Sequence, residues 1–170
     1  MLLKPLAKED ILFYLNDIYS CYKCNHLIFD CQNYFSDLTI GKLKTYIDSF
    51  ANGEDSLIYG IFDDSISFLY GLIIFDNMRF AENKSSAEVH IVVDKMLWGK
   101  QILNIFKNAI SKFPFTTYYC MIPAIATNAI RLCKKLGFKK TGYIPEVLPY
   151  INSKGEQRMY DIQIWSFIND

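Results

Sequence analysis

Apolar residues recur at two different periods along this chain of 170 residues. Apolar side chains three or four positions apart predict helices near residues 11–22, 40–50, 98–113 and 129–136. β-rich runs predict strands in MLLKPL, SLIYGIF, SISFLYGLIIF, AEVHIVV, TTYYCMI, GYIPEVLPYI and QRMYDIQIWSF. This order of elements predicts a mixed α/β sheet with helices on its faces.

Polar residues and glycine mark the ends of these elements. Asp10 is expected to cap the first helix, and Gly137 is expected to end the last one in a left-handed conformation. Asp63-Asp64 predicts a hairpin turn, and the polar segment NMRFAENKSS is expected to be a loop. Since no repeat, low-complexity tract or linker interrupts the pattern, we expect residues 1–170 to form a single domain.

Composition changes this picture mainly by excluding classes of partner. Eighteen basic residues balance 18 acidic ones, and no basic block occurs, so we expect no nucleic-acid binding. The apolar runs are too short to span a bilayer. The N-terminal segment MLLKPLAKED carries charges where a secretion signal needs a continuous apolar region. We therefore expect a cytoplasmic protein that binds no membrane.

Five cysteines without a secretory context favour free thiols. Cys21, Cys24, His26 and Cys31, in CYKCNHLIFDC, could together supply four tetrahedral zinc ligands. The spacing from His26 to Cys31 is not that of a standard zinc finger, and no second C-x2-C pair follows. We therefore assign no metal site, with zinc at these four residues as the open alternative.

Glu88 and His90 are the candidate residues for acid–base chemistry. They lie two positions apart on one expected strand, so both side chains point to the same face. A carboxylate beside an imidazole can tune a pKa towards neutrality, as a general base requires. The alternative is structural: Glu88 would be a strand-end carboxylate paired with a lysine, and His90 a hydrogen-bonded sheet residue.

Two longer segments resemble the GNAT acetyltransferase superfamily, and within it the branch of ribosomal-protein N-terminal acetyltransferases. AEVHIVVDKMLWGKQIL aligns without a gap with a segment of that branch, and NAIRLCKKLGFKKTGYI is similar to the superfamily's second motif. YINSKGEQRMYDIQIWSF, with its acidic Asp161, resembles the C-terminal hairpin of the branch. The positions that match in the first segment are Ala87, Glu88, Asp94, Trp98, Gly99 and Lys100. The resemblance is specific over residues 87–168.

The resemblance implies a GNAT acyl-CoA N-acyltransferase fold, with a mostly antiparallel sheet of about seven strands and about four helices, splayed between the fourth and fifth strands. It implies acetyl-CoA as co-substrate and direct transfer of the acetyl group to a primary amine of a small molecule or peptide. The implied cofactor-binding residues are Ile91, Val92 and Val93 on the splayed strand and Trp98, Gly99, Lys100, Gln101 and Ile102 at the phosphate-binding turn. Glu88 and His90 would provide the base, and Cys133 falls where the superfamily often has a tyrosine that protonates the departing thiolate.

Four positions depart from the superfamily pattern. Gln101 and Leu103 replace small residues at the phosphate-binding turn, Ala126 replaces an asparagine, and Cys133 replaces the tyrosine. Together they support a second hypothesis, a catalytically inactive GNAT-fold protein that serves as a binding or assembly component. Such a protein would resemble GNAT-like proteins of tailed phages and could reside in a virion. The sequence leaves open whether the chain acts alone, as a homodimer or with another protein partner.

Overall fold

The computed structural model describes residues 1–24, 38–97, 99–113, 115–151 and 156–169. The strands are β1 (Leu2–Pro5), β2 (Leu57–Phe62), β3 (Leu69–Ala81), β4 (Lys84–Val93), β5 (Thr117–Pro123), β6 (Lys139–Ile151) and β7 (Gln157–Ile168). The helices are α1 (Lys8–Phe13), α2 (Leu15–Cys24), α4 (Ile40–Ala51), the short 3-10 helix η1 (Lys95–Leu97), α5 (Lys100–Lys112) and α6 (Thr127–Leu136).

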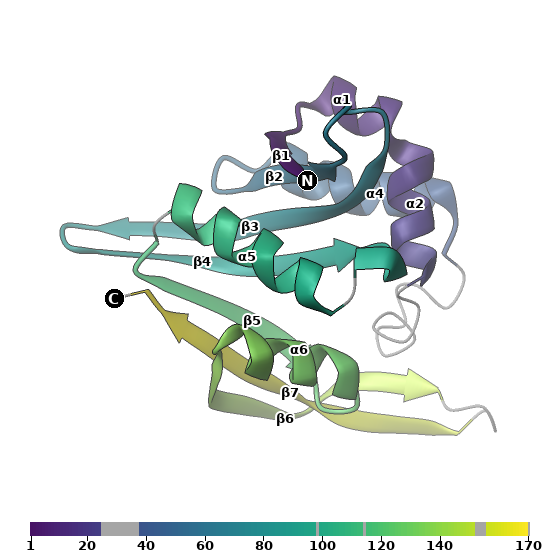
Figure 1. Cartoon of the computed structure of the whole chain (residues 1–170). Helices are drawn as coiled ribbons and strands as arrows, with labels where there is room; N and C mark the ends of the chain where they lie inside the picture. Colours follow the sequence, from purple (N-terminus) through teal and green to yellow (C-terminus); the bar gives the residue numbers. More distant parts are fainter. Residues whose placement is uncertain (25–37, 98, 114, 152–155, 170) are drawn as a thin grey trace.

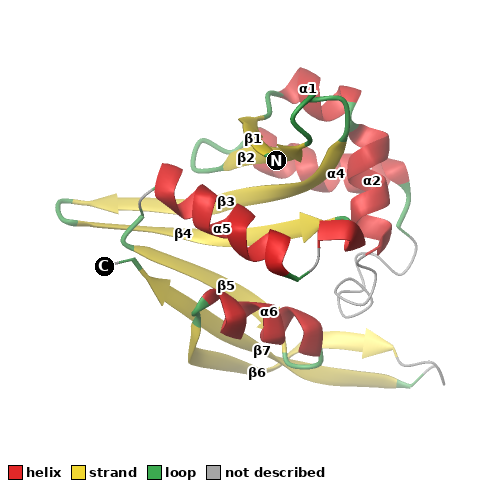
Figure 2. Cartoon of the chain, in the orientation of Figure 1, coloured by secondary structure: helices red, strands yellow, loops and turns green. Residues whose placement is uncertain are grey.

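The seven strands form one sheet in the order β1-β2-β3-β4-β5-β7-β6 (Figure 1). Every neighbouring pair is antiparallel except β4 and β5, which are parallel. Helices α5 and α6 both lie in front of the sheet in the view of Figure 2. This arrangement confirms the expected fold, a mixed and mostly antiparallel sheet whose fourth and fifth strands are its parallel pair.

Buried apolar side chains form two cores, one on each face of the sheet. The core under α5 and α6 contains Ile102, Ile105, Phe106 and Ala109 of α5, Cys133 of α6, and Ala87, Val89 and Val93 of β4. The core under α1, α2 and α4 contains Ile11, Ile18, Tyr22, Leu43, Ile47, Phe50 and, from β4, Val92. Alternate residues of β4 therefore enter opposite cores, as the twofold repeat of a strand requires.

Local signals explain several helix ends. Thr39 caps α4, because its Oγ1 accepts a hydrogen bond of 3.2 Å from the backbone N–H of Lys42. Gly137 ends α6 with a φ of 90°, which confirms the left-handed residue expected there. Asp10, in contrast, is not the cap of the first helix: α1 begins at Lys8, and the Asp10 carboxylate accepts a hydrogen bond from the N–H of Ala7.

The prediction of a loop at NMRFAENKSS was wrong. Strands β3 and β4 run through this polar segment and form a long hairpin that turns at residues 82–83 and projects past the rest of the sheet (Figure 1). Polar residues are tolerated there because the outer part of the hairpin is largely exposed, so its strands need no apolar face. Among the described residues, no helix is both long and apolar enough to cross a membrane.

Candidate active site

A cleft opens where β4 and β5 separate. The two strands pair only over Ser86–Glu88 and Thr117–Tyr119, although β4 continues to Val93 and β5 to Pro123. The ends of the two strands diverge in Figure 1, and the space between them contains a cleft of about 430 Å³. The cleft therefore passes through the sheet and is lined by residues from both faces.

One wall of the cleft comes from the face that carries α5 and α6. Gly99 directly precedes α5 and has a φ of 95°, a conformation that residues with a side chain rarely adopt. The N–H groups of the first turn of α5 lack partners within the helix, and the helix dipole makes this end attractive to anions. The residues that line this wall are Gly99, Ile102, Cys120, Ile122, Asn128, Ala129, Arg131, Leu132, Cys133, Lys135, Leu136 and Phe138.

The opposite wall carries aromatic and ionisable groups. Tyr22 of α2, Tyr46 of α4 and His90 of β4 line the cleft from this face. The ring of His90 lies 5.4 Å from that of Phe50, centroid to centroid, so it packs against the aromatic residues of α4. Helices α2 and α4 thus contribute two tyrosines to the wall that contains His90.

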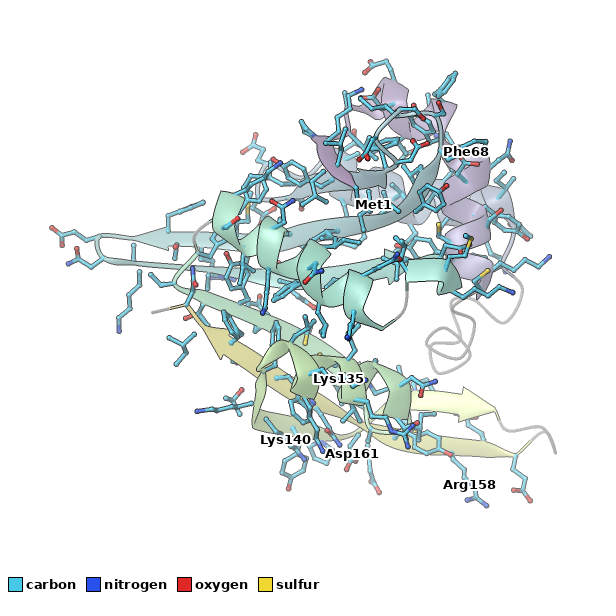
Figure 3. All side chains as sticks on the ribbon, viewed as in Figure 1. Met1, Phe68, Lys135, Lys140, Arg158 and Asp161 are labelled. Atoms are coloured by element: carbon cyan, nitrogen blue, oxygen red, sulfur yellow. The ribbon has the colours of Figure 1, made fainter. Side chains whose placement is uncertain are left out.

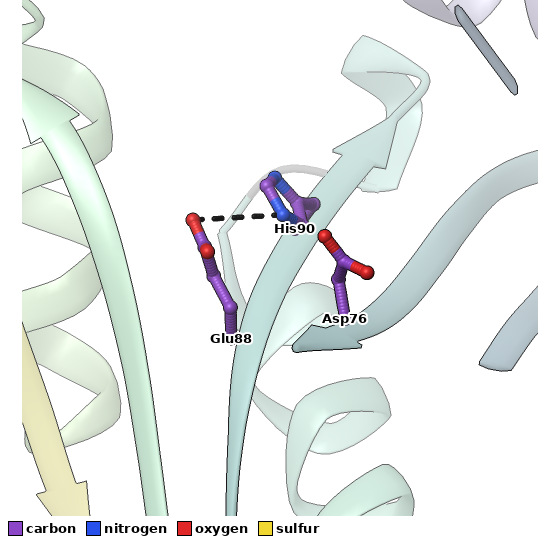
Figure 4. Close-up of side chains that lie close together, drawn as sticks. All are labelled: Asp76, Glu88 and His90. Carbon is purple, nitrogen blue, oxygen red and sulfur yellow. Dashed lines mark ion pairs between the residues drawn. The ribbon is translucent and has the colours of Figure 1, made fainter. Parts of the chain in front are cut away.

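Glu88, Asp76 and His90 lie together at the closed end of this wall (Figure 4). Glu88 is only 4% exposed, and Asp76 of β3 is its direct partner across the strand pair. Asn77 connects the two carboxylates, because its Nδ2 donates hydrogen bonds of 3.0 Å to Glu88 and 3.3 Å to Asp76. Ser56 donates a second hydrogen bond to Asp76. These donors provide hydrogen bonds to a buried carboxylate, that of Glu88, and to the half-buried carboxylate of Asp76 beside it.

His90 forms the link between this acidic group and the cleft. Its Nε2 lies 3.6 Å from Oε1 of Glu88, and Nε2 is buried without a hydrogen-bond partner in the described part of the protein. The side chain as a whole remains 29% exposed, so it faces both the cleft and Glu88. Glu88 is not among the residues that line the cleft. The strand thus places both predicted residues on one face, where His90 lines the cleft and Glu88 is buried next to it.

The electrostatic environment favours an uncharged imidazole and un-ionised phenols. Burial lowers the pKa of His90 below its ordinary value, although the charges of Glu88 and Asp76 act in the opposite direction. Burial, with a smaller effect of the same two carboxylates, raises the pKa of the Tyr46 hydroxyl to about 12. His90 is therefore neutral at neutral pH and able to accept a proton.

The same three residues form a set of metal-ligand types. One ligand atom from each of Asp76, Glu88 and His90 lies within 4.8 Å of the other two. The two carboxylates also accept hydrogen bonds from Asn77 and Ser56. Of the zinc alternative, Cys21 and Cys24 lie on α2, whereas His26 and Cys31 are outside the described residues. Burial raises the pKa of the Cys21 thiol to about 12.

Cys133 lies in the cleft wall beside a second thiol. Its Sγ is 3.5 Å from Sγ of Cys120, and both side chains are buried. The hydrogen bond with Cys133 and burial raise the pKa of Cys120 above its ordinary value. Neither Tyr118 nor Tyr143 lines the cleft. The Tyr118 hydroxyl donates to the carbonyl of Phe113, and Tyr143 is 61% exposed on β6, outside the cleft lining.

The predicted cofactor-binding residues divide into three groups. Ile91, Val92, Val93, Gly99 and Ile102 line the cleft. Lys100 and Gln101 are exposed and are not among the lining residues, and Trp98 lies outside the described residues.

Sequence reasoning missed several residues that the fold brings to the site. Asp76 and Asn77 lie on a neighbouring strand, and Tyr22 and Tyr46 lie on helices that carried no recognisable motif. Asn128 lines the cleft although it stands two positions away from the superfamily's asparagine. The sequence did indicate that the polar side chains of α6 share one face. Asn128, Arg131 and Lys135 are spaced three and four positions apart, as residues on one side of a helix are.

The described residues superpose on solved acetyltransferase structures over nearly their whole length. A spermidine N-acetyltransferase from Vibrio cholerae, in complex with CoA and spermine, matches with a TM-score of 0.68 and 17% identity, covering 99% of this chain and 95% of that chain. A putative phosphinothricin N-acetyltransferase matches with a TM-score of 0.70 and 19% identity, covering 99% and 98% of the two chains. No protein-family model and no curated protein sequence matches the chain. At these identities the likeness establishes the architecture, and the chain has the fold of the GNAT N-acetyltransferases.

Proposed function

We propose that this protein is an acetyl-CoA-dependent N-acetyltransferase that acts on a primary amine. The observation that carries the proposal is the cleft between β4 and β5, which crosses the sheet. One wall has the start of α5 and apolar side chains, and the other has two tyrosines and His90. Such a passage allows a donor to enter from the α5–α6 face and an acceptor from the α2–α4 face.

The α5–α6 wall fits the shape and charge of acetyl-CoA. Gly99 leaves the start of α5 open, since no atom of the described residues, apart from its chain neighbours, lies within 4 Å of the place where a Cβ would stand. The N–H groups that follow Gly99 would hold the pyrophosphate. The apolar lining by Ile102, Ile122 and Leu132 would surround the uncharged pantetheine arm. When bound, acetyl-CoA supplies an acetyl group activated as a thioester.

The exposed edge of β4 would stabilise the transition state. The N–H of Asp94 donates to the carbonyl of Tyr70 on β3. Because N–H groups alternate in direction along a strand, that of Ile91 points away from β3 and towards the cleft. A donor in this position would stabilise the negative charge that develops on the thioester oxygen.

His90 would act as the general base. It would remove a proton from the incoming ammonium group, and the amine nitrogen would then attack the thioester carbon directly. Glu88, 3.6 Å behind it, would stabilise the imidazolium that forms. As the carbon–sulfur bond breaks, Cys133 would donate its thiol proton to the departing thiolate and recover a proton from solvent or from the imidazolium.

The acceptor class follows from the acidic residues and from the resemblance. Asp76 and Glu88 provide a negative field on the acceptor side, which attracts an amine in its protonated form. The likeness of residues 87–168 to the ribosomal-protein branch makes peptide α-amines the first class to test, followed by small alkylamines.

Ligand-induced stabilisation tests the proposal directly. Acetyl-CoA at millimolar concentration should raise the melting temperature, because a ligand that binds the folded state stabilises it by mass action. Incubation with a panel of peptides and alkylamines should then yield an acetylated amine, identified by mass spectrometry. A correctly folded sample that shows neither a thermal shift nor a product would overturn the proposal.

A second candidate is a non-catalytic GNAT-fold protein that binds a partner, as in phage assembly. The departures at Gln101, Leu103, Ala126 and Cys133 favour it. So do exposed apolar side chains near α1 and the β2–β3 loop, where Phe13 is 79% and Phe68 is 61% exposed (Figure 3). This candidate predicts no acetyl-CoA binding and co-purification with a partner, so the thermal-shift experiment separates the two.

A further inference from the structure

Two cations lie in the wall of a mostly apolar cleft. Arg131 and Lys135 lie one turn apart on α6, and both line the cleft. Apart from His90, every other described residue that lines it is uncharged. In the described part of the chain, neither cation forms an ion pair, and α6 itself contains no acidic residue.

These cations lie opposite the expected phosphate-binding turn, which contributes no charged side chain to the cleft. On the opposite wall, Gly99 and Ile102 line the cleft, but Lys100 and Gln101 do not. The side chains of Lys100 and Gln101, which were expected to assist phosphate binding, are exposed to solvent instead. On that wall, the start of α5 offers a phosphate only its backbone N–H groups. Helix α6 faces α5 across the cleft, with Lys135 on it (Figure 3), and supplies positive charge to the same space.

The neighbouring lysine shows that this placement is specific. Lys134 lies between the two cations in sequence but does not line the cleft. Its Nζ instead lies 5.8 Å from the centroid of the Trp165 ring, on the sheet below. Of the three basic residues of α6, two face the cleft and one does not, so Lys134 is a natural control.

We propose that Arg131 and Lys135 bind the phosphate groups of the acyl donor, so that the protein selects a phosphate-bearing CoA donor over an unphosphorylated pantetheine thioester. The inference rests on the proposed function and deepens it. The guanidinium of Arg131 can contact phosphate oxygens through two parallel N–H groups, and Lys135 adds a mobile point charge one turn away. In this arrangement the charge on α6 replaces the contacts that the degenerate turn before α5 no longer provides.

Calorimetric titration with CoA and with pantetheine tests the proposal without requiring turnover. In the double variant Arg131→Gln/Lys135→Gln, the Kd for CoA should rise by about 10-fold to 100-fold, because two charge-assisted contacts are lost. The Kd for pantetheine should not change. Lys134→Gln should bind both ligands like the wild type. The affinity of the wild type for CoA should also fall with rising salt, more steeply than that of the double variant.

The outcomes separate this inference from the proposed function. If the folded double variant binds CoA as tightly as the wild type, or if Lys134→Gln weakens binding equally, the assignment of Arg131 and Lys135 is wrong while the function stands. If the wild type binds neither CoA nor pantetheine, the proposed function fails and the inference fails with it. Melting curves for both variants establish that each is folded, and single substitutions replace the double variant if it is not.

Discussion

The two walls of the cleft differ in how they handle charge. On the α2–α4 side, the carboxylates of Asp76 and Glu88 are held by hydrogen bonds behind a neutral His90. On the α5–α6 side, the charges belong to Arg131 and Lys135, which are exposed to solvent. The acidic groups are thus buried or half-buried and held by hydrogen bonds, whereas the cations are exposed to solvent.

This difference follows from what each side is proposed to do. Moving a proton requires a base with a tuned pKa, and burial beside fixed charges provides that tuning. Holding a phosphate requires only nearby positive charge, which long solvated side chains provide without a cost of burial. Four predictions test the contrast, from the largest expected effect to the smallest.

The largest effect is expected at the proposed base. His90→Gln should lower kcat by about 10² to 10⁴, since it removes the group proposed to accept the ammonium proton. The affinity for CoA should stay the same, because His90 lies on the acceptor side. Steady-state kinetics and calorimetry measure the two quantities. A variant with wild-type kcat would exclude His90 as the base.

Glu88→Gln should have a smaller effect on rate and a distinctive effect on pH dependence. The Glu88 charge acts to raise the pKa of His90, so its removal should lower that pKa further. In the proposed mechanism the rate depends on neutral imidazole, so it should fall as the pH drops through the pKa of His90. The acid limb of the kcat profile should therefore move to lower pH, while kcat falls by about 10-fold to 100-fold.

The exposed Glu82, in the β3–β4 turn, provides the control for this measurement. Glu82→Gln should leave both the rate and the profile unchanged. A Glu88→Gln variant with a reduced rate but an unmoved acid limb would indicate a purely structural role for Glu88.

On the donor side, Gly99→Ala should weaken CoA binding by about tenfold. A residue with a Cβ is strained by about 1–3 kcal/mol at the φ of 95° and ψ of −129° observed there, so the start of α5 would shift. At saturating acetyl-CoA, kcat should be retained. Gly41→Ala, at an uncrowded site in α4, should leave CoA binding unchanged. Equal CoA affinity in Gly99→Ala and the wild type would show that the turn does not contact the donor.

The smallest effect is expected at Asn77, which contacts both carboxylates. Asn77 has a φ of 50°, so glycine preserves the backbone there while removing the amide. Asn77→Gly should lower kcat by about threefold to tenfold, because the Glu88 carboxylate loses a hydrogen bond that orients it. Asn83→Gly in the exposed turn is the control, and a loss of equal size there would contradict a positioning role.

The sequence predicted the elements better than their boundaries. The apolar stripe of α5 and the β-rich runs were strong signals, and each corresponds to an observed helix or strand. The outer half of the β3–β4 hairpin was missed because its polar residues carry no alternating pattern. Asp10 was misassigned because an acidic residue in the first helical turn resembles a cap in sequence.

The candidate site was predicted only in part, for a related reason. Glu88 and His90 could be paired from their spacing within one strand. The contacts from Asp76 and Asn77 depend on the register between β3 and β4, including the irregularity between Asp76 and Arg79. Local spacing carries no information about such pairing between strands.

The sequence by itself determined the two-sided character of β4. Its alternation places Glu88 and His90 on one face and Ala87 and Val89 on the other, whichever strands lie beside it. Only the tertiary structure decided that pairing with β5 stops after Glu88, and that α6 brings cations to the opening. Backbone geometry fixes the side-chain period within a strand. The point where two strands part depends on the packing of helices and side chains from distant parts of the chain.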